Sequence, residues 1–322
     1  MEPIKQKIAR FPWKTKSGRT IPMGVGCAYL GSNAKDKTDD PIGNDIKLME
    51  QTYEAGFRLY DTSADYGMSE DVVGGFLKTI DRDSIFLATK SPFPFRNKSK
   101  AAAFEEFKKI FYKSFERLGV DYIDLYQIHD TDDIYVCFDE VIPFLRDRQA
   151  EGIIGYIGMG TRDLLALELG VRTGALQSCL TYLEYSVLKT SAQPLFDTCE
   201  RLGAGVLNAA TLHYGVLKAE DPMQRTYDRT GGSILPSQLH VSEAAVVMQK
   251  LLKELGNVPI IAAALQISLF NAKIDVTLNG ITRASNLAST LEAMDQVIYP
   301  EQWQAIFKAR EALPYSNIQD WP

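Results

Sequence analysis

The chain has 322 residues, 45% hydrophobic and 24% charged, a balance typical of a globular protein with a sizeable core. Its formal net charge of -6 argues against a nucleic-acid partner, and the absence of a long uncharged apolar run argues against membrane insertion. Four scattered cysteines and a polar N-terminus predict reduced thiols in a cytoplasmic protein.

Short apolar runs alternate with longer amphipathic stretches along the chain. Residues 10–20 come first, and Ser17-Gly18 between short extended pieces predicts a hairpin ahead of the first strand. If the strands that follow close into a barrel, we expect this hairpin to close its bottom. The predicted strands that follow are Ile21–Val25, Arg58–Asp61, Ile85–Lys90, Asp124–His129, Ile153–Met159, Leu176–Leu180, Gly205–Ala209 and Asp275–Leu278. Eight strands separated by helices predict an α/β fold, a (β/α)8 TIM barrel forming one domain over residues 1–322.

Helical spacing of apolar residues predicts helices over Lys100–Leu118 and Asp133–Glu151, the second capped by Asp132. An open doubly wound sheet would show the same alternation of strands and helices. Its glycine-rich fingerprint is missing, because Gly24, Gly26 and Gly31 have the wrong spacing, so we interpret these glycines as a tight turn at a barrel mouth.

The segment Gly215–His240 breaks the alternation. It carries Asp221-Pro222, Gly231-Gly232 and Pro236 with little periodicity, which predicts a long loop after strand seven. Loops that follow the strands of a barrel lie on its catalytic face, so we expect a flexible lid.

Three consecutive predicted strands end in an ionisable residue, namely Asp61, Lys90 and His129. Each has a simpler interpretation, since a carboxylate often caps a turn, a lysine often lies at the surface and a lone histidine is often a core residue. The ends of neighbouring strands meet at one mouth, however, and Tyr66 follows Asp61 closely. We expect the Lys90 ammonium, held by Asp61, to lower the pKa of Tyr66 so that its phenol can donate a proton.

His129 has two possible roles at this mouth. A neutral imidazole could orient a substrate carbonyl toward Tyr66. Alternatively, the segment His129 to Asp133 could bind a metal ion, but such sites on this fold need several histidines and the chain has three, with His213 and His240 far downstream. We therefore expect no metal.

The segment Asp61–Gly67, Lys90 and Ile128-His129-Asp130 resemble the aldo-keto reductase superfamily, and the resemblance extends over nearly the whole chain. It implies a catalytic tetrad in which Tyr66 is the general acid, Asp61 and Lys90 tune it, and His129 orients the substrate. It also implies NADP or NAD as cofactor and a small carbonyl or sugar substrate. Leu180–Tyr185 and Asn208–Leu217 are similar to the branch of L-galactose and L-fucose dehydrogenases, which oxidise sugars at the anomeric carbon.

The same resemblance implies where the cofactor binds. Gly160-Thr161 stands where the family commonly has Ser-Asn, and Tyr182 where it commonly has Gln, while Tyr214 is less firmly placed. Arg283 either pairs with a 2'-phosphate or is an ordinary surface arginine, which leaves NAD against NADP open. The implied cofactor-binding residues are Gly26, Thr161, Tyr182, Thr211, Leu212, Gly280, Thr282 and Arg283.

Two other functions remain compatible with these residues. Lys90 at a strand end also fits a Schiff-base aldolase that needs no nicotinamide. A dinucleotide-binding regulatory subunit without turnover is the other alternative. The sequence predicts no particular oligomeric state.

Overall fold

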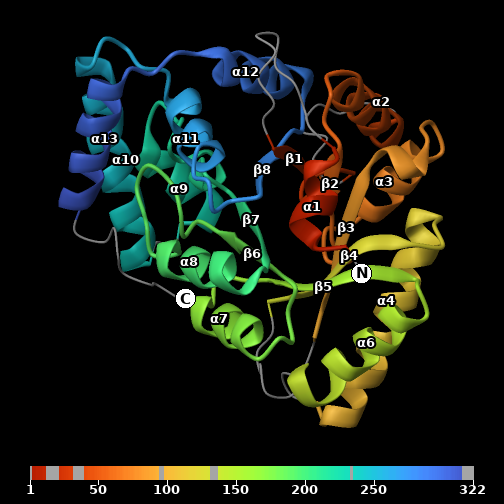
Figure 1. The fold of residues 1–322 in the computed structure, drawn as a ribbon. Helices are drawn as coiled ribbons and strands as arrows, with labels where there is room; N and C mark the ends of the chain where they lie inside the picture. The colour runs from red at the N-terminus through yellow and green to blue at the C-terminus, as the bar shows by residue number, and fades with distance from the viewer. Residues whose placement is uncertain are drawn as a thin grey trace.

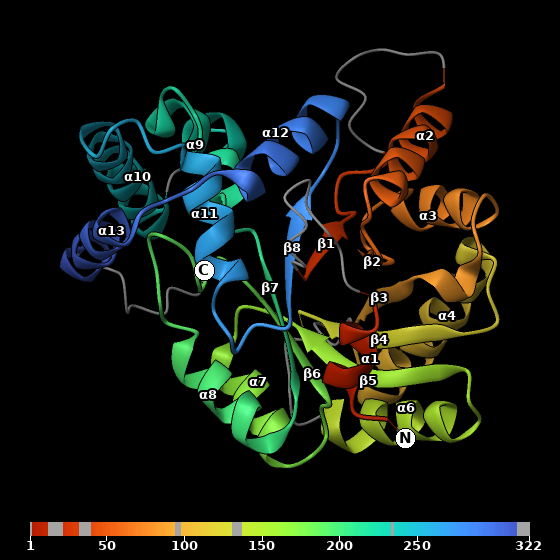
Figure 2. The same ribbon diagram turned by 45° about the horizontal axis from the view of Figure 1, so that its top comes forward.

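A computed structural model describes residues 2–11, 22–31, 40–93, 98–130, 137–232 and 235–313. Its strands are β1 (Met23–Gly26), β2 (Leu59–Asp61), β3 (Phe86–Pro92), β4 (Ile123–His129), β5 (Ile154–Gly160), β6 (Ser178–Tyr182), β7 (Gly205–Ala209) and β8 (Val276–Gly280). All pair in parallel, and β8 pairs with β1 to close the barrel (Figure 2). The predicted (β/α)8 barrel is confirmed, with each strand end within two residues of its predicted place.

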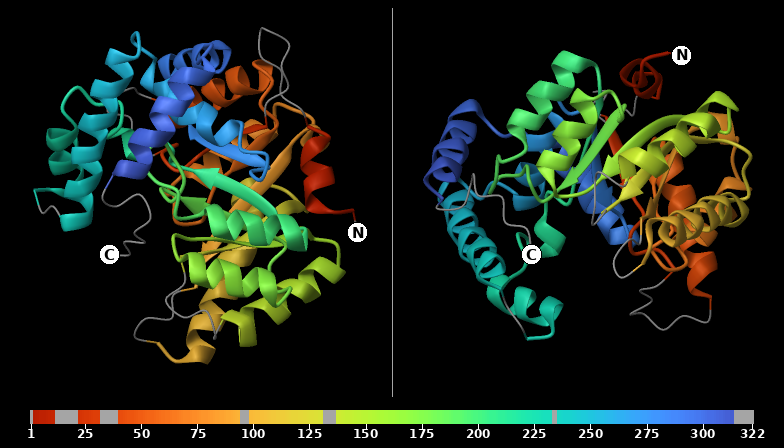
Figure 3. Two further views of the ribbon diagram at one scale, coloured as in Figure 1. Left: turned by 60° about the vertical axis from the view of Figure 1, so that its left-hand side comes forward. Right: turned by 90° about the horizontal axis from the view of Figure 1, so that it is seen from below.

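Helices cover the strands, and most of them surround the barrel on its outside (Figure 1). They are α1 (Ile4–Ala9), α2 (Pro41–Glu54), α3 (Ser69–Leu77), α4 (Lys100–Leu118), α6 (Ile142–Ala150), α7 (Leu164–Arg172), α8 (Gln193–Leu202), α9 (Pro222–Thr230), α10 (Pro236–Glu254), α11 (Ile260–Leu269), α12 (Ala284–Asp295) and α13 (Pro300–Ala312). Helices α10 and α13 lie side by side beyond the ring (Figure 3). Within the described ranges, no helix combines the length and apolarity needed to cross a membrane.

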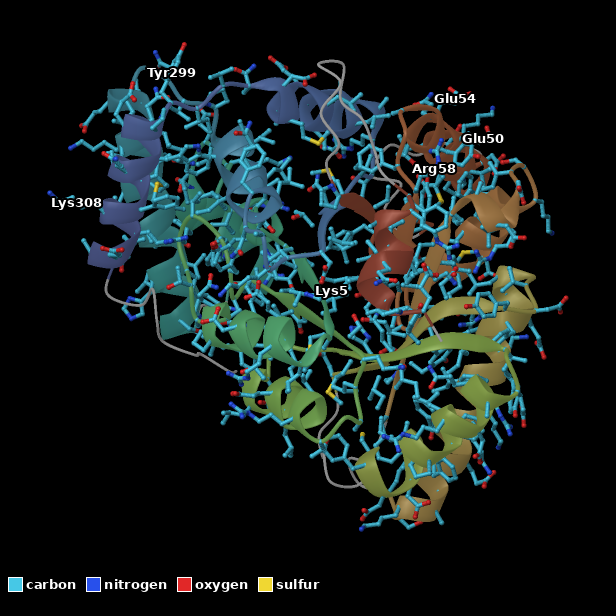
Figure 4. All side chains as sticks on the ribbon, viewed as in Figure 1. Lys5, Glu50, Glu54, Arg58, Tyr299 and Lys308 are labelled. Atoms are coloured by element: carbon cyan, nitrogen blue, oxygen red, sulfur yellow. The ribbon has the colours of Figure 1, made fainter. Side chains whose placement is uncertain are left out.

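Helix α1 closes the N-terminal end of the barrel. Ile4 and Ile8 are buried in a cluster with inward-facing strand residues such as Leu59, Phe86 and Tyr156. Lys5, labelled in Figure 4, extends from the same helix to within 3.5 Å of Asp275. The predicted hairpin falls almost entirely outside the described residues. A six-residue helix that sequence periodicity did not reveal covers the barrel bottom.

A buried carboxylate joins this helix to the barrel. One oxygen of Asp124 lies 2.5 Å from the Lys7 ammonium, and the other accepts from Arg82 at 2.7 Å and from the Leu87 backbone at 2.9 Å. Asp124 itself is 3% exposed. One carboxylate therefore holds two cations at the face of the barrel opposite the strand ends that carry Asp61, Lys90 and His129.

Helix α4 shows how local signals set an element. Ser99 accepts a hydrogen bond from the Ala102 backbone at its start, and Gly119 ends it in the left-handed region with φ 65°. Phe107, Phe111 and other residues of one face are fully buried. The predicted helix over Lys100–Leu118 is confirmed to the residue.

The predicted loop over Gly215–His240 is wrong, because helix α9 and the first residues of α10 occupy much of it. Asp221 accepts from the Gln224 backbone at 2.9 Å as an N-cap, and Pro222 occupies the first turn, where proline has no N–H to lose. Gly231, with φ 65°, ends the helix. Such residues are typical of loops, but here they mark the two ends of one short helix.

Two smaller predictions also need correction. Gly24 and Gly26 belong to β1 and not to a turn, and a Cβ at Gly24 would come within 2.7 Å of Leu278 and Leu59. Gly31, in contrast, has the positive φ of a turn residue. The helix predicted from Asp133 has its start, including Asp132, outside the described residues. Its described part begins with a π-helical turn over Cys137–Val141, and α6 follows.

Candidate active site

The ends of three neighbouring strands bring Asp61, Lys90 and His129 together. β2 pairs with β3, and β3 pairs with β4. The chain after β2 then folds over the end of β3, because the Ala64 backbone donates to the Lys90 carbonyl at 2.9 Å. The next turn carries Tyr66, whose ring lies 4.8 Å from the Lys90 ammonium. The predicted convergence of these four residues is therefore observed.

Lys90 is held as a buried ammonium. Its Nζ lies 2.6 Å from an oxygen of Asp61 and donates to the Thr62 carbonyl at 2.7 Å, and the residue is 1% exposed. Burial acts to lower the pKa of Lys90, but attraction to Asp61 and Tyr66 outweighs it and raises the pKa above its ordinary value. Lys90 thus supplies a fixed positive charge beside the Tyr66 phenol.

The pKa of Tyr66 is shifted in the direction opposite to the predicted one. Burial raises it, and although the Lys90 charge lowers it as predicted, the net pKa lies above the ordinary value. The prediction of a lowered pKa is therefore wrong, because desolvation of the phenolate exceeds its stabilisation by Lys90. Near neutral pH the Tyr66 side chain is a neutral phenol, which is the form that donates a proton.

His129 stands between Tyr66 and two carboxylates. Its ring meets the Tyr66 ring edge-on at 5.4 Å, and Nδ1 lies 3.1 Å from the Ser63 hydroxyl. Nδ1 is also 3.5 Å from Asp65, and Nε2 is 3.5 Å from Asp130. Asp130 has a φ of 38° that few non-glycine residues adopt. Among the described residues, no group of three or more potential ligand side chains could hold a metal ion.

Gln127 is a site residue that the sequence analysis missed. Its amide donates to the second oxygen of Asp61 at 2.9 Å, and the residue is fully buried. Glycines of β5 make room for these side chains. A Cβ at Gly158 would lie 3.1 Å from Gln127 Cγ, and one at Gly160 would lie 3.1 Å from Lys90 Cδ. A polar residue inside an apolar strand, facing a strand with alternating glycines, was the available signal.

The residues predicted to bind the nicotinamide half of the cofactor lie at the ends of β5, β6 and β7. Thr161 directly follows β5, and its hydroxyl accepts from the Asp163 backbone at 3.2 Å. Tyr182 ends β6 and donates to both oxygens of Asp130 at 3.1 Å. Thr211 and Leu212 form the turn after β7. Tyr214 follows them, with the Arg229 guanidinium 4.1 Å from its ring centre.

The residues predicted to bind the adenosine half lie around β8 and α12. Gly26 and Gly280 are opposite each other in the β1–β8 pair, and a Cβ at Gly280 would meet no atom within 4 Å. Arg283 is exposed at the N-cap of α12, and no side chain caps the helix there. Uncapped backbone N–H groups next to an exposed guanidinium are donors that suit a phosphate, so these residues fit a dinucleotide.

Comparison with known proteins agrees with this geometry. The family model for aldo/keto reductases matches residues 22–311. The chain belongs to the aldo/keto reductase family. It is an NAD(P)-dependent oxidoreductase, as the family's cofactor use implies.

Two curated relatives match almost end to end. The chain is 28% identical to a D-threo-aldose 1-dehydrogenase from a Pseudomonas species, over 93% of this chain and 97% of the relative. It is 27% identical to an L-galactose dehydrogenase from Arabidopsis thaliana, over 93% and 92%. An aldo-keto reductase from Bacillus halodurans, solved in its holo form, superposes with a TM-score of 0.70 at 22% identity, covering 95% of this chain and 98% of that one.

The two alternative functions do not fit these findings. A Schiff base requires a neutral amine with a free electron pair, whereas Lys90 is a buried, ion-paired ammonium with a raised pKa. A regulatory subunit without turnover does not fit an oxidoreductase family that covers nearly the whole chain.

Replacement of Lys90 tests its effect on Tyr66. In Lys90→Met the cation that lowers the Tyr66 pKa is gone, so burial and the negative charges of Asp61 and Asp130 raise the pKa unopposed. We expect lower turnover and a pH profile of kcat/KM displaced to more alkaline pH. Because an unpaired Asp61 would destabilise the fold by about 3–5 kcal/mol, Lys90→Met/Asp61→Asn should be measured in parallel. A folded double variant with the parent pH profile would contradict the assigned role.

Proposed function

We propose that this oxidoreductase transfers a hydride between nicotinamide and a carbonyl or sugar anomeric carbon, with Tyr66 as general acid and base. The observation that carries the proposal is the half-buried Tyr66 phenol, whose ring lies 4.8 Å from the Lys90 ammonium and 5.4 Å from the His129 ring. A phenol held beside a fixed cation can lose and regain a proton at one position.

In the oxidative direction the substrate is a cyclic aldose. The C1–H bond breaks and its electron pair leaves as hydride, while the proton of the 1-hydroxyl passes to the Tyr66 phenolate and the C1–O bond becomes a carbonyl, which gives a lactone. Thr161, Tyr182, Thr211 and Leu212 would hold an oxidised nicotinamide ring, which would supply the hydride acceptor and a positive charge that favours the tyrosinate. His129 holds the reacting oxygen near the Tyr66 hydroxyl.

The polar groups around His129 support a sugar substrate. Asp65 and Asp130 are each 3.5 Å from a ring nitrogen, and their side chains are 49% and 37% exposed, so their oxygens can accept hydrogen bonds from hydroxyl groups. The two curated relatives are named as dehydrogenases of aldoses, which supports the same substrate class.

The cofactor residues implied by the family resemblance complete the proposal. Thr161, Tyr182, Thr211 and Leu212 would line the nicotinamide half, at the ends of three adjacent strands. Gly26, Gly280, Thr282 and Arg283 would receive the adenosine half. Their place at the C-terminal ends of the strands, the end of the barrel that also carries Asp61, Lys90 and His129, supports this assignment.

Tyr66→Phe tests the proton donor. The variant keeps the ring packing against His129 and removes the hydroxyl, so we expect the fold and dinucleotide binding to persist while kcat falls by about 10²- to 10⁴-fold. Turnover and cofactor affinity are measured on the same preparation, and an exposed phenol, Tyr299→Phe, serves as the control at 56% exposure. Turnover near that of the parent would rule out the role of Tyr66.

A substrate panel tests the sugar assignment. We expect free aldopentoses and aldohexoses to be oxidised fastest above neutral pH, because the raised pKa of Tyr66 delays formation of the phenolate that accepts the proton. Analogues with a 2-deoxy or O-methyl group should react more slowly, since the polar groups of the site are then left unpaired. Higher catalytic efficiency for reduction of simple aldehydes than for oxidation of any aldose would overturn this assignment.

Arg283 decides between the two dinucleotides. If its guanidinium binds a 2'-phosphate, Arg283→Ala should weaken NADP(H) by about 1.5–3 kcal/mol, the typical strength of a charge-assisted hydrogen bond, and should leave NAD(H) nearly unchanged. Dissociation constants for both cofactors provide the measurement. Equal losses would make Arg283 an ordinary surface arginine.

A further inference from the structure

A buried ionic cluster of Glu184, Arg162 and Lys189 lies in the segments that follow β5 and β6. Both oxygens of the fully buried Glu184 carboxylate are occupied. Arg162 donates to Oε1 through Nε at 2.8 Å and Nη2 at 2.6 Å, and the Lys189 ammonium lies 2.8 Å from Oε2. The Ser191 hydroxyl also donates to Oε2, at 2.5 Å. Since burying charge is costly without partners, this arrangement fixes the three charged side chains relative to one another.

A second contact joins the segment after β6, which carries Glu184 and Lys189, to the turn after β7. His213 Nε2 lies 2.8 Å from the Ser186 hydroxyl, and Arg310 of α13 donates to the Ser186 carbonyl at 3.3 Å. Burial, together with the charges of Lys189 and Arg162, lowers the pKa of His213 to about 3. His213 is therefore neutral at ordinary pH and joins the turn after β7 to the segment after β6.

The backbone at these strand ends is strained. Leu183, Ala210, His213 and Tyr214 all have φ between 48° and 68°, a region that non-glycine residues rarely adopt. Such conformations persist where surrounding contacts hold them, and they concentrate at functional sites. Leu183 directly precedes Glu184, and His213 itself belongs to the cluster, so the buried contacts act on the strained residues.

Each cluster residue at a strand end is a near neighbour in sequence of a residue that the proposed function assigns to nicotinamide. Arg162 follows Thr161, Glu184 lies two residues after Tyr182, and His213 follows Leu212. We propose that Glu184, through Arg162, Lys189 and the Ser186–His213 contact, is a positioning residue that holds the nicotinamide-facing ends of β5, β6 and β7. This inference rests on the proposed placement of the cofactor. Because Glu184 is fully buried, we assign it no direct contact with cofactor or substrate.

The other end of the barrel offers a matched control. Asp124 is also a buried carboxylate with two cations, Lys7 and Arg82, but it lies at the N-terminal face. Asp124→Asn and Glu184→Gln each remove one carboxylate charge and leave two cations behind. Both should lower the melting temperature, so the loss of fold stability is the same kind of change in the two variants.

The test compares a whole dinucleotide with a fragment that lacks nicotinamide. Dissociation constants are measured by calorimetry for NADPH and 2'-phospho-ADP-ribose, and for NADH and ADP-ribose. We expect Glu184→Gln to weaken the better dinucleotide by about tenfold or more, which is roughly 1.4 kcal/mol, and to change the matching fragment less than about twofold. Asp124→Asn should leave the ratio of the two constants at the parent value.

A second variant keeps the inference testable if Glu184→Gln does not fold. His213→Asn breaks the contact to Ser186 without changing charge, and asparagine tolerates the positive φ at this position. It should shift the same ratio in the same direction. Equal weakening of dinucleotide and fragment, or a parent-like ratio in folded variants, would overturn the positioning role. The proposed function would fail differently, through parent-like turnover of Tyr66→Phe.

Discussion

The ion pair between Asp61 and Lys90 is the contact on which the arrangement of the site depends. An ammonium that is 1% exposed is tolerated only with a close anion and filled hydrogen-bond positions. Asp61 supplies the anion, the Thr62 carbonyl accepts a second hydrogen bond from the ammonium and Gln127 donates to the far oxygen of the carboxylate. Packing alone would not determine where these atoms lie, but the requirement to pair each buried charge does.

That requirement also accounts for residues with no polar group. The side chains of Lys90 and Gln127 need space in the barrel interior. Strand β5 provides it with Gly158 and Gly160, because a Cβ at either position would lie 3.1 Å from a methylene carbon of Gln127 or Lys90. The interior then divides along its axis. Apolar side chains and α1 fill the N-terminal end, while the polar groups lie at the C-terminal strand ends. A rigid apolar floor and a polar upper layer are typical of catalysis on this fold.

The sequence was sufficient for the parts set by local rules. Strand periodicity and the helix caps located the barrel, and ionisable residues at strand ends located Asp61, Lys90 and His129. It was misleading where one residue type has two meanings, as with Asp221-Pro222 and Gly231, which begin and end α9. The sequence marks Gln127 as a polar residue inside an apolar strand, but it does not reveal its partner or the Glu184 cluster, because these contacts join residues that are distant in sequence, as between Gln127 and Asp61 or Arg162 and Glu184. The sign of the Tyr66 pKa shift was also inaccessible, since it depends on how deeply the phenol is buried.

Burial of the Tyr66 phenol has opposite effects on the two directions of reaction. Burial favours the neutral phenol, and the Lys90 ammonium favours the phenolate, with burial the larger influence in this structure. A neutral phenol is the form required to protonate an alkoxide during reduction, whereas oxidation requires the phenolate to accept a proton. A change that admits water to Tyr66 would lower its pKa and extend oxidation to less alkaline pH, but would also screen the attraction of Lys90 that keeps the two groups together. The packing around Tyr66 therefore influences the pH range of each direction as directly as the charged residues do.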